Sequence, residues 1–249
     1  MTRRWPDFSI EQNIWKRGFK IVIGVDEVGR GAFAGPVVAG ACALKIKNYE
    51  SRIKNQGEKI TNSLDSILKL GINDSKKLTP GKREKLAPEI KKYFYWAVGE
   101  GSVAAINGYG IKKATEIAMR QAIIRLFFQV ASHISSPANK LLTPQVILQM
   151  KPYLLLDAFH IRYVPVVGLK CQQAVIGGDG KSISIAASSI VAKVYRDNLM
   201  RNLCRDSLKR YRWDENKGYG TTDHREAIKS FGITKFHRKQ FVASWMKGH

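Results

Sequence analysis

Four carboxylates lie where the functional groups of an α/β protein usually gather, at the carboxyl ends of strands. Asp26 and Glu27 follow an apolar run that starts at residue 21, Asp157 ends the run YLLLD, and Asp179 lies in GGDGKS, before a long apolar-periodic segment. Adjacent side chains on a strand point to opposite faces, so Asp26 and Glu27 need a bend to share one ligand. Each acid alone also has a structural explanation, and for Asp179 alone a helix cap is favoured.

Taken together, these acids indicate a site for divalent cations. Carboxylates held close together raise one another's pKa and destabilise the fold, and a divalent cation removes that penalty. Mg²⁺ prefers oxygen ligands and suits carboxylates that meet a phosphate, and two such ions can promote phosphodiester cleavage. The basic chain, the acids and the lack of a His/Cys cluster therefore predict metal-dependent phosphodiester cleavage, although spacing alone does not make the acids converge. Asp197, beside Arg196, is expected to form a surface or an interhelical ion pair.

The charge of the chain points to a polyanionic partner. Its 249 residues carry 42 Lys and Arg against 20 Asp and Glu, a formal net charge of +22. Nucleic acid is the first candidate partner; the alternative is a generally basic proteome, which would spread the charge evenly. The three cysteines are far apart and form no CxxC pair, which excludes a zinc knuckle or a disulfide framework.

No apolar run approaches the roughly 18–20 residues that span a bilayer. The N-terminal segment MTRRWPDFSIEQN has no apolar stretch of the secretory kind. We therefore expect a soluble, cytoplasmic protein that does not contact a membrane.

The elements that must position the acids follow from the apolar patterns. Strands are predicted at 19–26, 36–46, 93–105 and 153–159, with further short pieces at 164–170 and 171–179. Helices are predicted from Thr79-Pro80, at 111–130, and at 182–211, the last being the longest. Residues 48–70 are polar apart from an amphipathic piece at 64–70, residues 132–150 form a surface connection with one short helix, and the tail from 214 is looped, then helical. Early strands and later helices indicate an α/β or α+β class with one central sheet.

Five segments, in order along the chain, resemble the signatures of the ribonuclease HII family. They are GVDEVGRGAFAGPVV, DSKKLTPGKREKL, LLLDAF, GDGKSISIAASSIVAKVYRD and GYGTTDHREAIKSFGITKFHRKQF, and they cover most of residues 20–241. The Gly29-Arg30-Gly31 form of the first loop favours HII over the related ribonuclease HIII.

The resemblance implies a fold and a division of the chain. The expected fold is an α/β, ribonuclease H-like fold, with a mixed five-stranded central sheet flanked by helices and a small C-terminal helical extension. The expected parts are an N-terminal arm at 1–19, a catalytic domain at 20–212 and a C-terminal extension at 213–249. The protein is expected to be a monomer.

The resemblance also implies an activity. The expected enzyme is a metal-dependent endonuclease that cleaves the RNA strand of RNA/DNA hybrids. It would also cut on the 5′ side of a single ribonucleotide embedded in duplex DNA, leaving 3′-hydroxyl and 5′-phosphate ends. Its expected roles are the removal of embedded ribonucleotides and of RNA primers.

The catalytic metal ligands of the family map onto Asp26, Glu27, Asp157 and Asp179. This assignment replaces the helix-cap interpretation of Asp179 and leaves Asp197 structural. The expected cofactors are two Mg²⁺ or Mn²⁺ ions, bound together with substrate.

Further family residues imply how the substrate is held. The loop Gly29-Arg30-Gly31 is expected to place groups against a 2′-hydroxyl, which distinguishes RNA from DNA. Tyr219, in GYGT, is expected to bond the same hydroxyl and to stack on the following deoxyribose. Contacts to backbone phosphates are expected from four residues, Lys76, Lys77, Lys181 and Ser182.

Two other classes of function stay open at this point. One is a nucleic-acid binder without catalysis, which the charge alone would support. The other is a different enzyme on the same fold, such as an integrase or a resolvase, and the Gly29-Arg30-Gly31 loop argues against it.

Overall fold

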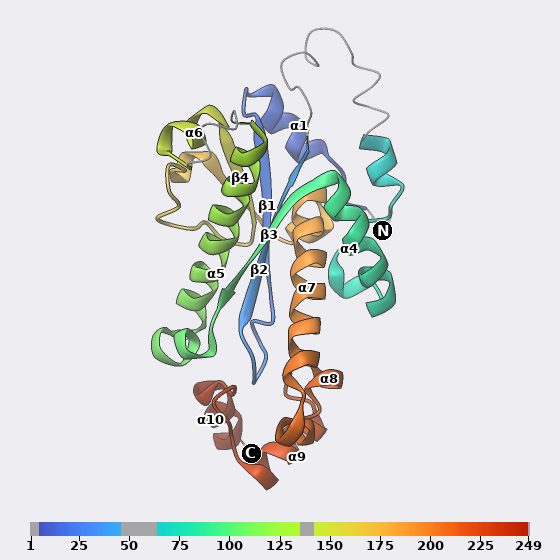
Figure 1. Ribbon diagram of the computed structural model, residues 1–249, viewed down its shortest axis with the longest axis vertical. Coiled ribbons are helices and arrows are strands. Elements are labelled where there is room, and N and C mark those ends of the chain that lie inside the picture. Colours follow the sequence, from blue (N-terminus) through green and yellow to red (C-terminus); the bar gives the residue numbers. More distant parts are fainter. Residues whose placement is uncertain (1–4, 46–63, 135–141, 249) are drawn as a thin grey trace.

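A computed structural model describes residues 5–45, 64–134 and 142–248, and its centre is a five-stranded sheet (Figure 1). The strands follow the order β3-β2-β1-β4-β5. They are β1 (Ile21–Val28), β2 (Val37–Leu44), β3 (Phe94–Gly101), β4 (Pro152–Asp157) and β5 (Gln172–Val175).

The sheet is mixed, as predicted, because its two halves pair differently. β1, β2 and β3 are joined antiparallel, whereas β4 and β5 add to β1 in parallel. Val25 on β1 lies opposite Leu156 on β4, so the next residues of both strands, Asp26 and Asp157, come side by side. The register of this parallel pair thus brings together two acids that are 131 positions apart in the sequence.

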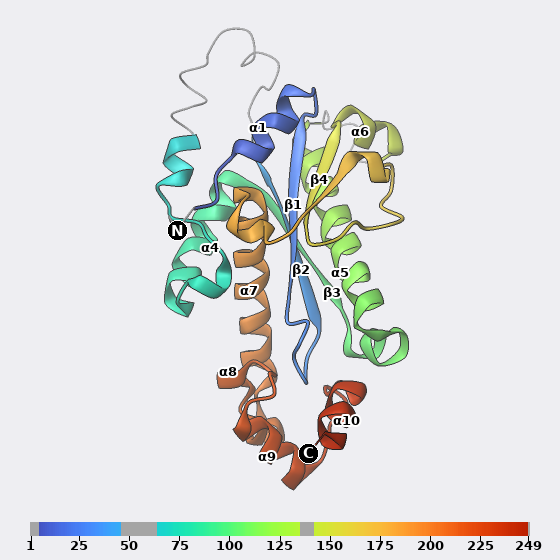
Figure 2. The same cartoon turned by 180° about the vertical axis from the view of Figure 1, so that it is seen from behind.

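Helices cover both faces of the sheet (Figures 1 and 2). The long α5 (Val103–Ile134) lies on one face, and α7 (Ile183–Leu203) lies on the other with α4 (Pro80–Tyr93) beside it. Apolar clusters on each face form the core, one under α5 and two on the face that α7 covers. The shorter α1 (Ser9–Lys16) and α6 (Pro144–Gln149) lie near the end of the sheet where β1 and β4 begin.

α7 packs unusually close to β1 because Gly24 has no side chain. A Cβ built on Gly24 would lie 2.1 Å from the carbonyl carbon of Ser184 in α7. Gly40 on β2 has the same role, since its Cβ would lie 2.3 Å from the carbonyl oxygen of Ser188. This close contact fixes the start of α7 against the strand that carries Asp26.

The C-terminal part forms a small helical unit beyond the end of α7 (Figure 2). It contains α8 (Trp213–Asn216), α9 (Thr222–Phe231) and α10 (Lys239–Lys247), which pack around buried Tyr211 and Trp213. The unit is joined to the loop after β1, where the backbone N–H groups of Phe33 and Ala34 donate to the carbonyl of Gly218 at 2.7 and 3.0 Å.

Most predicted elements are present, and three differ. The helix predicted at 182–211 ends at Leu203 and is not the longest, because the part of α5 that follows the kink at Gly110 runs on to Ile134. The strand predicted at 93–105 stops at Gly101. Instead of a strand, 164–170 has one isolated bridge, between Val164 and Val167.

Several predictions fall partly outside the described residues. Of the segment 48–70, only residues from 64 onward are described, and 64–68 are helical. The proposed boundaries of the arm and of the C-terminal extension stay predictions. Within the described residues, no helix is both long and apolar enough to cross a membrane.

Candidate active site

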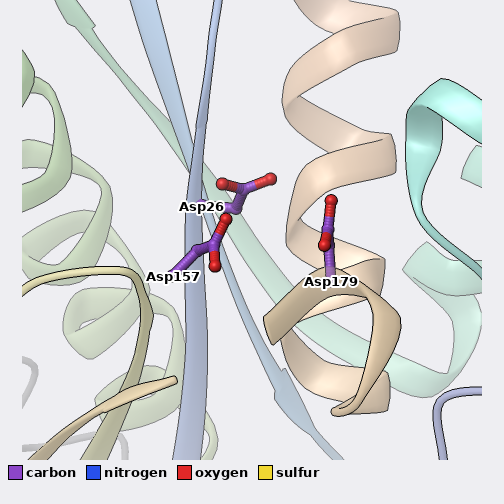
Figure 3. A group of neighbouring side chains, drawn as sticks. All are labelled: Asp26, Asp157 and Asp179. Atoms are coloured by element: carbon purple, nitrogen blue, oxygen red, sulfur yellow. The ribbon is translucent and has the colours of Figure 1, made fainter. Parts of the chain in front are cut away.

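Three of the four predicted acids meet at one point (Figure 3). Asp26 comes from β1, Asp157 is the last residue of β4, and Asp179 lies in the short 3₁₀ turn Gly178–Gly180 before α7. One carboxylate oxygen from each acid lies within 4.8 Å of those of the other two. This arrangement of oxygens could hold a divalent cation.

Burial and mutual repulsion make the cluster costly without a counter-charge. Burial is the main factor that raises the pKa of Asp26 to about 8, and the charges of Glu27, Asp157 and Asp179 add to it. Burial also raises the pKa of Asp179, with the charges of Asp74 and Asp157 as further causes. A bound cation would reverse this balance by favouring the ionised carboxylates.

Glu27 is near this cluster but outside the group of three. Its carboxylate pairs with the guanidinium of Arg30 at 3.2 Å, and Arg30 partly opposes the rise in its pKa that burial causes. The alternation of side chains along β1 separates Glu27 from Asp26, as the spacing predicted. A role for Glu27 as a metal ligand stays a prediction.

The turn that carries Asp179 is tied to Asp157. The backbone N–H of Gly178 donates to Oδ1 of Asp157 at 2.9 Å. Asp179 is not the helix cap, because Ser182 has that role and accepts from the N–H of Ile185 at 3.2 Å. Asp179 therefore keeps its carboxylate available to the cluster.

The three predicted phosphate-binding lysines lie at the surface around the cluster. Lys76 is 3.8 Å from the carboxylate of Asp179, and Lys77 is 3.7 Å from that of Asp74. Lys181 donates to the carbonyl of Ile176 at 2.8 Å. Their contacts with phosphate stay predictions.

Ser182 does not fit the prediction of a phosphate contact. Its side chain is fully buried, and its hydroxyl donates to Glu11 at 2.6 Å while it caps α7. Within the signature GDGKSISIAASSIVAKVYRD, Ser182 therefore has a structural role, which is to cap α7 and to bind Glu11.

Two polar residues beside the acids were missed by the sequence analysis. Asp74 lies close enough to Asp179 to raise its pKa, and buried Ser189 on α7 lies close enough to Asp26 to oppose the rise in the pKa of that carboxyl. Ser189 also donates to Ser75 at 2.9 Å, which connects the DSKK segment to α7. Asp74 begins the DSKK segment, and its position two residues before Lys76, a predicted phosphate-binding residue, was a signal that could have identified it.

Two buried arginines hold the backbone of the loop after β1 from its inner side. Arg196 donates to the carbonyls of Ala34 and Pro36, and Arg238 donates to those of Arg30 and Gly35. These four bonds fix the backbone of the loop without using its exposed side.

Glycine is required at one position of this loop and leaves open space at another. Gly29 has φ +82°, and a Cβ there would lie 2.0 Å from Nε of Arg196. Gly31 is exposed, and a Cβ there would meet nothing within 4 Å. The guanidinium of Arg30 lies over the ring of Phe159 at 5.6 Å, so the exposed side of the loop faces the segment that follows β4.

Tyr219 lies over α7, on the same side as the loop. Its ring centroid is 5.4 Å from the guanidinium of Arg196 and 5.7 Å from Nζ of Lys193. Its half-buried ring is therefore placed by cations of α7, and its role with substrate stays a prediction.

Of the two ion pairs that the sequence allowed for Asp197, the structure has the interhelical one. The carboxylate lies 3.6 Å from Arg83 on α4 and 2.7 Å from Lys193 within α7. It is buried, so the pair is internal and not on the surface.

A chain of buried histidines holds the backbone of Tyr219. Nδ1 of His237 accepts from the N–H of Thr234 at 2.9 Å, so its proton is on Nε2, which lies 3.3 Å from Nε2 of His224. Nε2 of His224 also accepts from Trp213 at 3.0 Å, so its Nδ1 donates to the carbonyl of Tyr219 at 2.9 Å. Both imidazoles are neutral in this chain, because protonation would place a hydrogen where an acceptor is needed.

We expect this histidine pair to make stability fall in mild acid. Burial, with His224 as a second cause, lowers the pKa of His237 from 6.5 to about 4. The unfolded chain therefore binds a proton before the folded chain does, and the contribution is complete above pH 6.5 and lost as the pH falls toward 4. Between these limits it amounts to about 3 kcal/mol for His237.

Urea unfolding of wild type and His237→Gln at several pH values between 7.5 and 4.5 checks this. The variant should lose part of the pH slope that wild type shows. His160→Gln, at an exposed position, is the matched control and should keep the wild-type slope. Equal slopes in all three proteins would contradict the assignment of neutral histidines.

A mixed five-stranded sheet with acids that converge from two neighbouring parallel strands is the arrangement expected of a nuclease of the ribonuclease H class, and comparison with known proteins shows that class. The family model described as Ribonuclease HII matches residues 23–244. The chain therefore belongs to the ribonuclease HII family, whose members are endonucleases of this class.

Individual relatives agree over nearly the whole chain. It is 37% identical over 239 residues to the ribonuclease HII of Wolbachia pipientis subsp. Culex pipiens (strain wPip), covering 96% of this chain and 97% of that one. It is 38% identical over 240 residues to that of Ehrlichia ruminantium (strain Welgevonden), covering 95% and 94%.

Solved structures are similar in fold. The ribonuclease H2 of Pyrococcus horikoshii OT3 matches with a TM-score of 0.57 at 20% identity, covering 91% of this chain and 99% of that one. A Bst ribonuclease HIII, solved in complex with Mn²⁺, matches with a TM-score of 0.59 at 18% identity, covering 93% and 71%.

Proposed function

We propose that this enzyme cleaves the RNA strand of RNA/DNA hybrids and cuts on the 5′ side of a single ribonucleotide embedded in duplex DNA. The products are a 3′-hydroxyl and a 5′-phosphate. The corresponding roles are the removal of embedded ribonucleotides and of RNA primers. The observation that carries the proposal is the convergence of Asp26, Asp157 and Asp179 within 4.8 Å in a chain of net charge +22.

The residues present fit divalent cations. The donor set is entirely carboxylate oxygen. Burial and neighbouring carboxylates raise the pKa values of Asp26 and Asp179, and a bound cation would favour their ionised forms. Asp26, Asp157 and Asp179 would hold Mg²⁺ or Mn²⁺, and Glu27 would join them if it leaves Arg30. When bound, such ions activate water for in-line attack on phosphorus and stabilise the leaving 3′-oxygen.

The remaining residues orient the substrate. The ammonium group of Lys76 lies 3.8 Å from the carboxylate of Asp179, at the exposed side of the acid cluster, where it could bind a phosphate of the substrate. The loop Gly29-Arg30-Gly31 exposes backbone held rigid by Arg196 and Arg238, which suits recognition of a 2′-hydroxyl by hydrogen bonds.

Cleavage of a defined duplex tests the proposal. An end-labelled DNA duplex with one ribonucleotide is incubated with Mg²⁺ or Mn²⁺, beside an all-DNA duplex and a reaction with EDTA. We expect one cut on the 5′ side of the ribonucleotide and none in either control. Tight binding without a cut under any condition would overturn the proposal in favour of a binding protein, and cleavage of the all-DNA duplex would indicate another nuclease.

Tyr219→Phe should affect the two substrates unequally. Removing the phenolic hydroxyl deletes one proposed hydrogen bond to the ribose at the junction but keeps the ring over Arg196 and Lys193. We expect kcat/KM on the single-ribonucleotide duplex to fall about tenfold, which is the effect of one lost hydrogen bond. The continuous hybrid should change less than threefold, and an equal loss on both would argue against junction sensing by Tyr219.

A further inference from the structure

The N-terminal helix α1 contacts the segment that carries the third acid. The family model begins at residue 23, so α1 lies outside the matched region. Before α1, the backbone N–H of Asp7 lies 3.3 Å from the carbonyl of Lys181, and the N–H of Ile183 donates to the carbonyl of Asp7 at 3.2 Å. This short bridge places α1 against the first turn of α7.

Glu11 of α1 is buried in this contact and holds the helix start from its side chain. Its side chain is fully buried, and Oε1 accepts from the hydroxyl of Ser182 at 2.6 Å and from the N–H of Ser184 at 2.9 Å. A carboxylate at a helix N-terminus is stabilised by the unpaired N–H groups there. Burial raises the pKa of Glu11, and the bonds from Ser182 and Ser184 oppose that rise.

Ser182 transmits this contact to the acid cluster. Its backbone N–H donates to the carbonyl of Gly178 at 2.9 Å, and the N–H of Gly178 donates to Oδ1 of Asp157 at 2.9 Å. Asp179 follows Gly178 directly, within the same turn. Three successive hydrogen bonds thus run from Glu11 through Ser182 and Gly178 to Asp157, and the turn that they hold carries Asp179.

We propose that Glu11 is a positioning residue for the reaction, which fixes Asp179 and Asp157 at the separation that cation binding requires. The inference rests on the proposed function, since it concerns the same site. Glu11 does not reach the cluster itself and acts through Ser182 and Gly178.

The proposal predicts a specific kinetic defect. Without the carboxylate, the Ser182 hydroxyl and the Ser184 N–H lose their buried acceptor, and the turn before α7 relaxes. The concentration of Mg²⁺ needed for half-maximal activity should rise and kcat should fall. KM for the duplex should change little, because the loop Gly29-Arg30-Gly31, Lys76 and Lys77 lie outside this contact.

The experiment compares Glu11→Ala, Glu11→Gln and Ile14→Ala on the single-ribonucleotide duplex. Ile14 is a buried residue of α1 in the apolar cluster with Val22 and Tyr153, so its truncation loosens α1 but keeps the carboxylate. Each protein is measured for urea stability, kcat, KM and the Mg²⁺ concentration for half-maximal activity, at a temperature where all are folded.

We expect Glu11→Ala to lower kcat about 10- to 100-fold and to raise the half-activating Mg²⁺ concentration several-fold. Glu11→Gln keeps an acceptor oxygen and should recover kcat to within about threefold of wild type. Ile14→Ala should lose stability but keep the wild-type kcat and Mg²⁺ dependence.

Two outcomes would overturn the inference. One is wild-type kcat and Mg²⁺ dependence in Glu11→Ala; the other is an equal defect in Ile14→Ala, which would reduce Glu11 to a docking contact. If Glu11→Ala does not fold, Glu11→Asp, which draws the carboxylate back by one methylene, takes its place with the same expectations at smaller size. Wild type run in parallel separates the two proposals, because failure of wild type to cleave would contradict the function and not the positioning role.

Discussion

Asp26→Asn should lower kcat by on the order of a thousandfold or more, which corresponds to about 4 kcal/mol of lost transition-state stabilisation. Asp26 is the most buried of the three converging acids, at 4% exposed. An amide has nearly the same shape but cannot supply an anionic oxygen to a cation. Duplex binding should survive, because the substrate contacts that we propose are made by other residues.

The same substitution should leave the cation-free protein at least as stable as wild type. The pKa of Asp26 is raised to about 8, so in EDTA near neutral pH this carboxyl must take up a proton on folding, and a neutral amide avoids that cost. The opposite holds with cation, since a ligand that binds only the folded state stabilises it. Added Mn²⁺ should therefore raise the Tm of wild type but hardly that of Asp26→Asn.

Single-turnover cleavage, duplex binding and thermal melts with EDTA or Mn²⁺ check both parts. Asp206→Asn, at an exposed position in the C-terminal unit, removes one negative charge outside the cluster and should behave as wild type. Cleavage by Asp26→Asn within tenfold of wild type would remove Asp26 from the catalytic site.

The sequence alone located the acids, and the sheet register explains why they meet. An acid after an apolar run indicates a strand end. Asp157 does end β4, whereas β1 continues for two residues past Asp26, to Val28. Their adjacency depends on the parallel pairing of β1 with β4, a contact between segments 131 positions apart that no local pattern encodes. For Asp179 the local sequence pattern favoured a helix cap. In the structure Ser182 caps α7, and the proximity of Asp179 to Asp157 shows that Asp179 belongs to the acid cluster.

Polar residues that turned out to be buried were the hardest to predict. Arg196 and Arg238 are fully buried, although arginine in a basic chain is expected at the surface. Their donors satisfy loop carbonyls that come from more than 150 positions away along the chain. Ser182 was misassigned for the same reason, because its partner Glu11 lies 171 positions away.

Helix ends were predicted well where side chains cap them and poorly where glycine interrupts them. Thr79 caps α4 by accepting from the N–H of Lys82, as the Thr-Pro pair indicated. The long helical segment after Gly110 begins where the apolar periodicity predicts it, at 111; Gly110, with φ +81° and ψ 164°, bends the chain there and separates it from a short helical stretch from Val103 that was not predicted. The apolar periodicity is visible only after that bend.

Gly24→Ala should be the most damaging single-methyl change on the sheet face that supports the site. The added Cβ would lie 2.1 Å from the carbonyl carbon and 2.3 Å from the carbonyl oxygen of Ser184, and also 2.3 Å from the N of Ile185. All three are backbone atoms, so no side-chain rotation relieves the overlap, and α7 must move away from β1. We expect a loss of about 3 kcal/mol or more in the free energy of unfolding.

The same displacement should reduce activity in the protein that remains folded. Asp26 is two residues after Gly24 on β1, and the turn with Asp179 leads directly into α7, so moving the helix changes the separation of the two carboxylates. Urea unfolding and cleavage at 25 °C measure both effects. Gly108→Ala in α5 is the matched control: its Cβ would meet nothing within 4 Å, and a helical alanine in place of glycine should stabilise by about 0.5–1 kcal/mol. If Gly24→Ala instead matched wild type in stability and kcat, β1 and α7 would have to be further apart than this structure places them, and the geometry of the acid cluster would have to be revised with them.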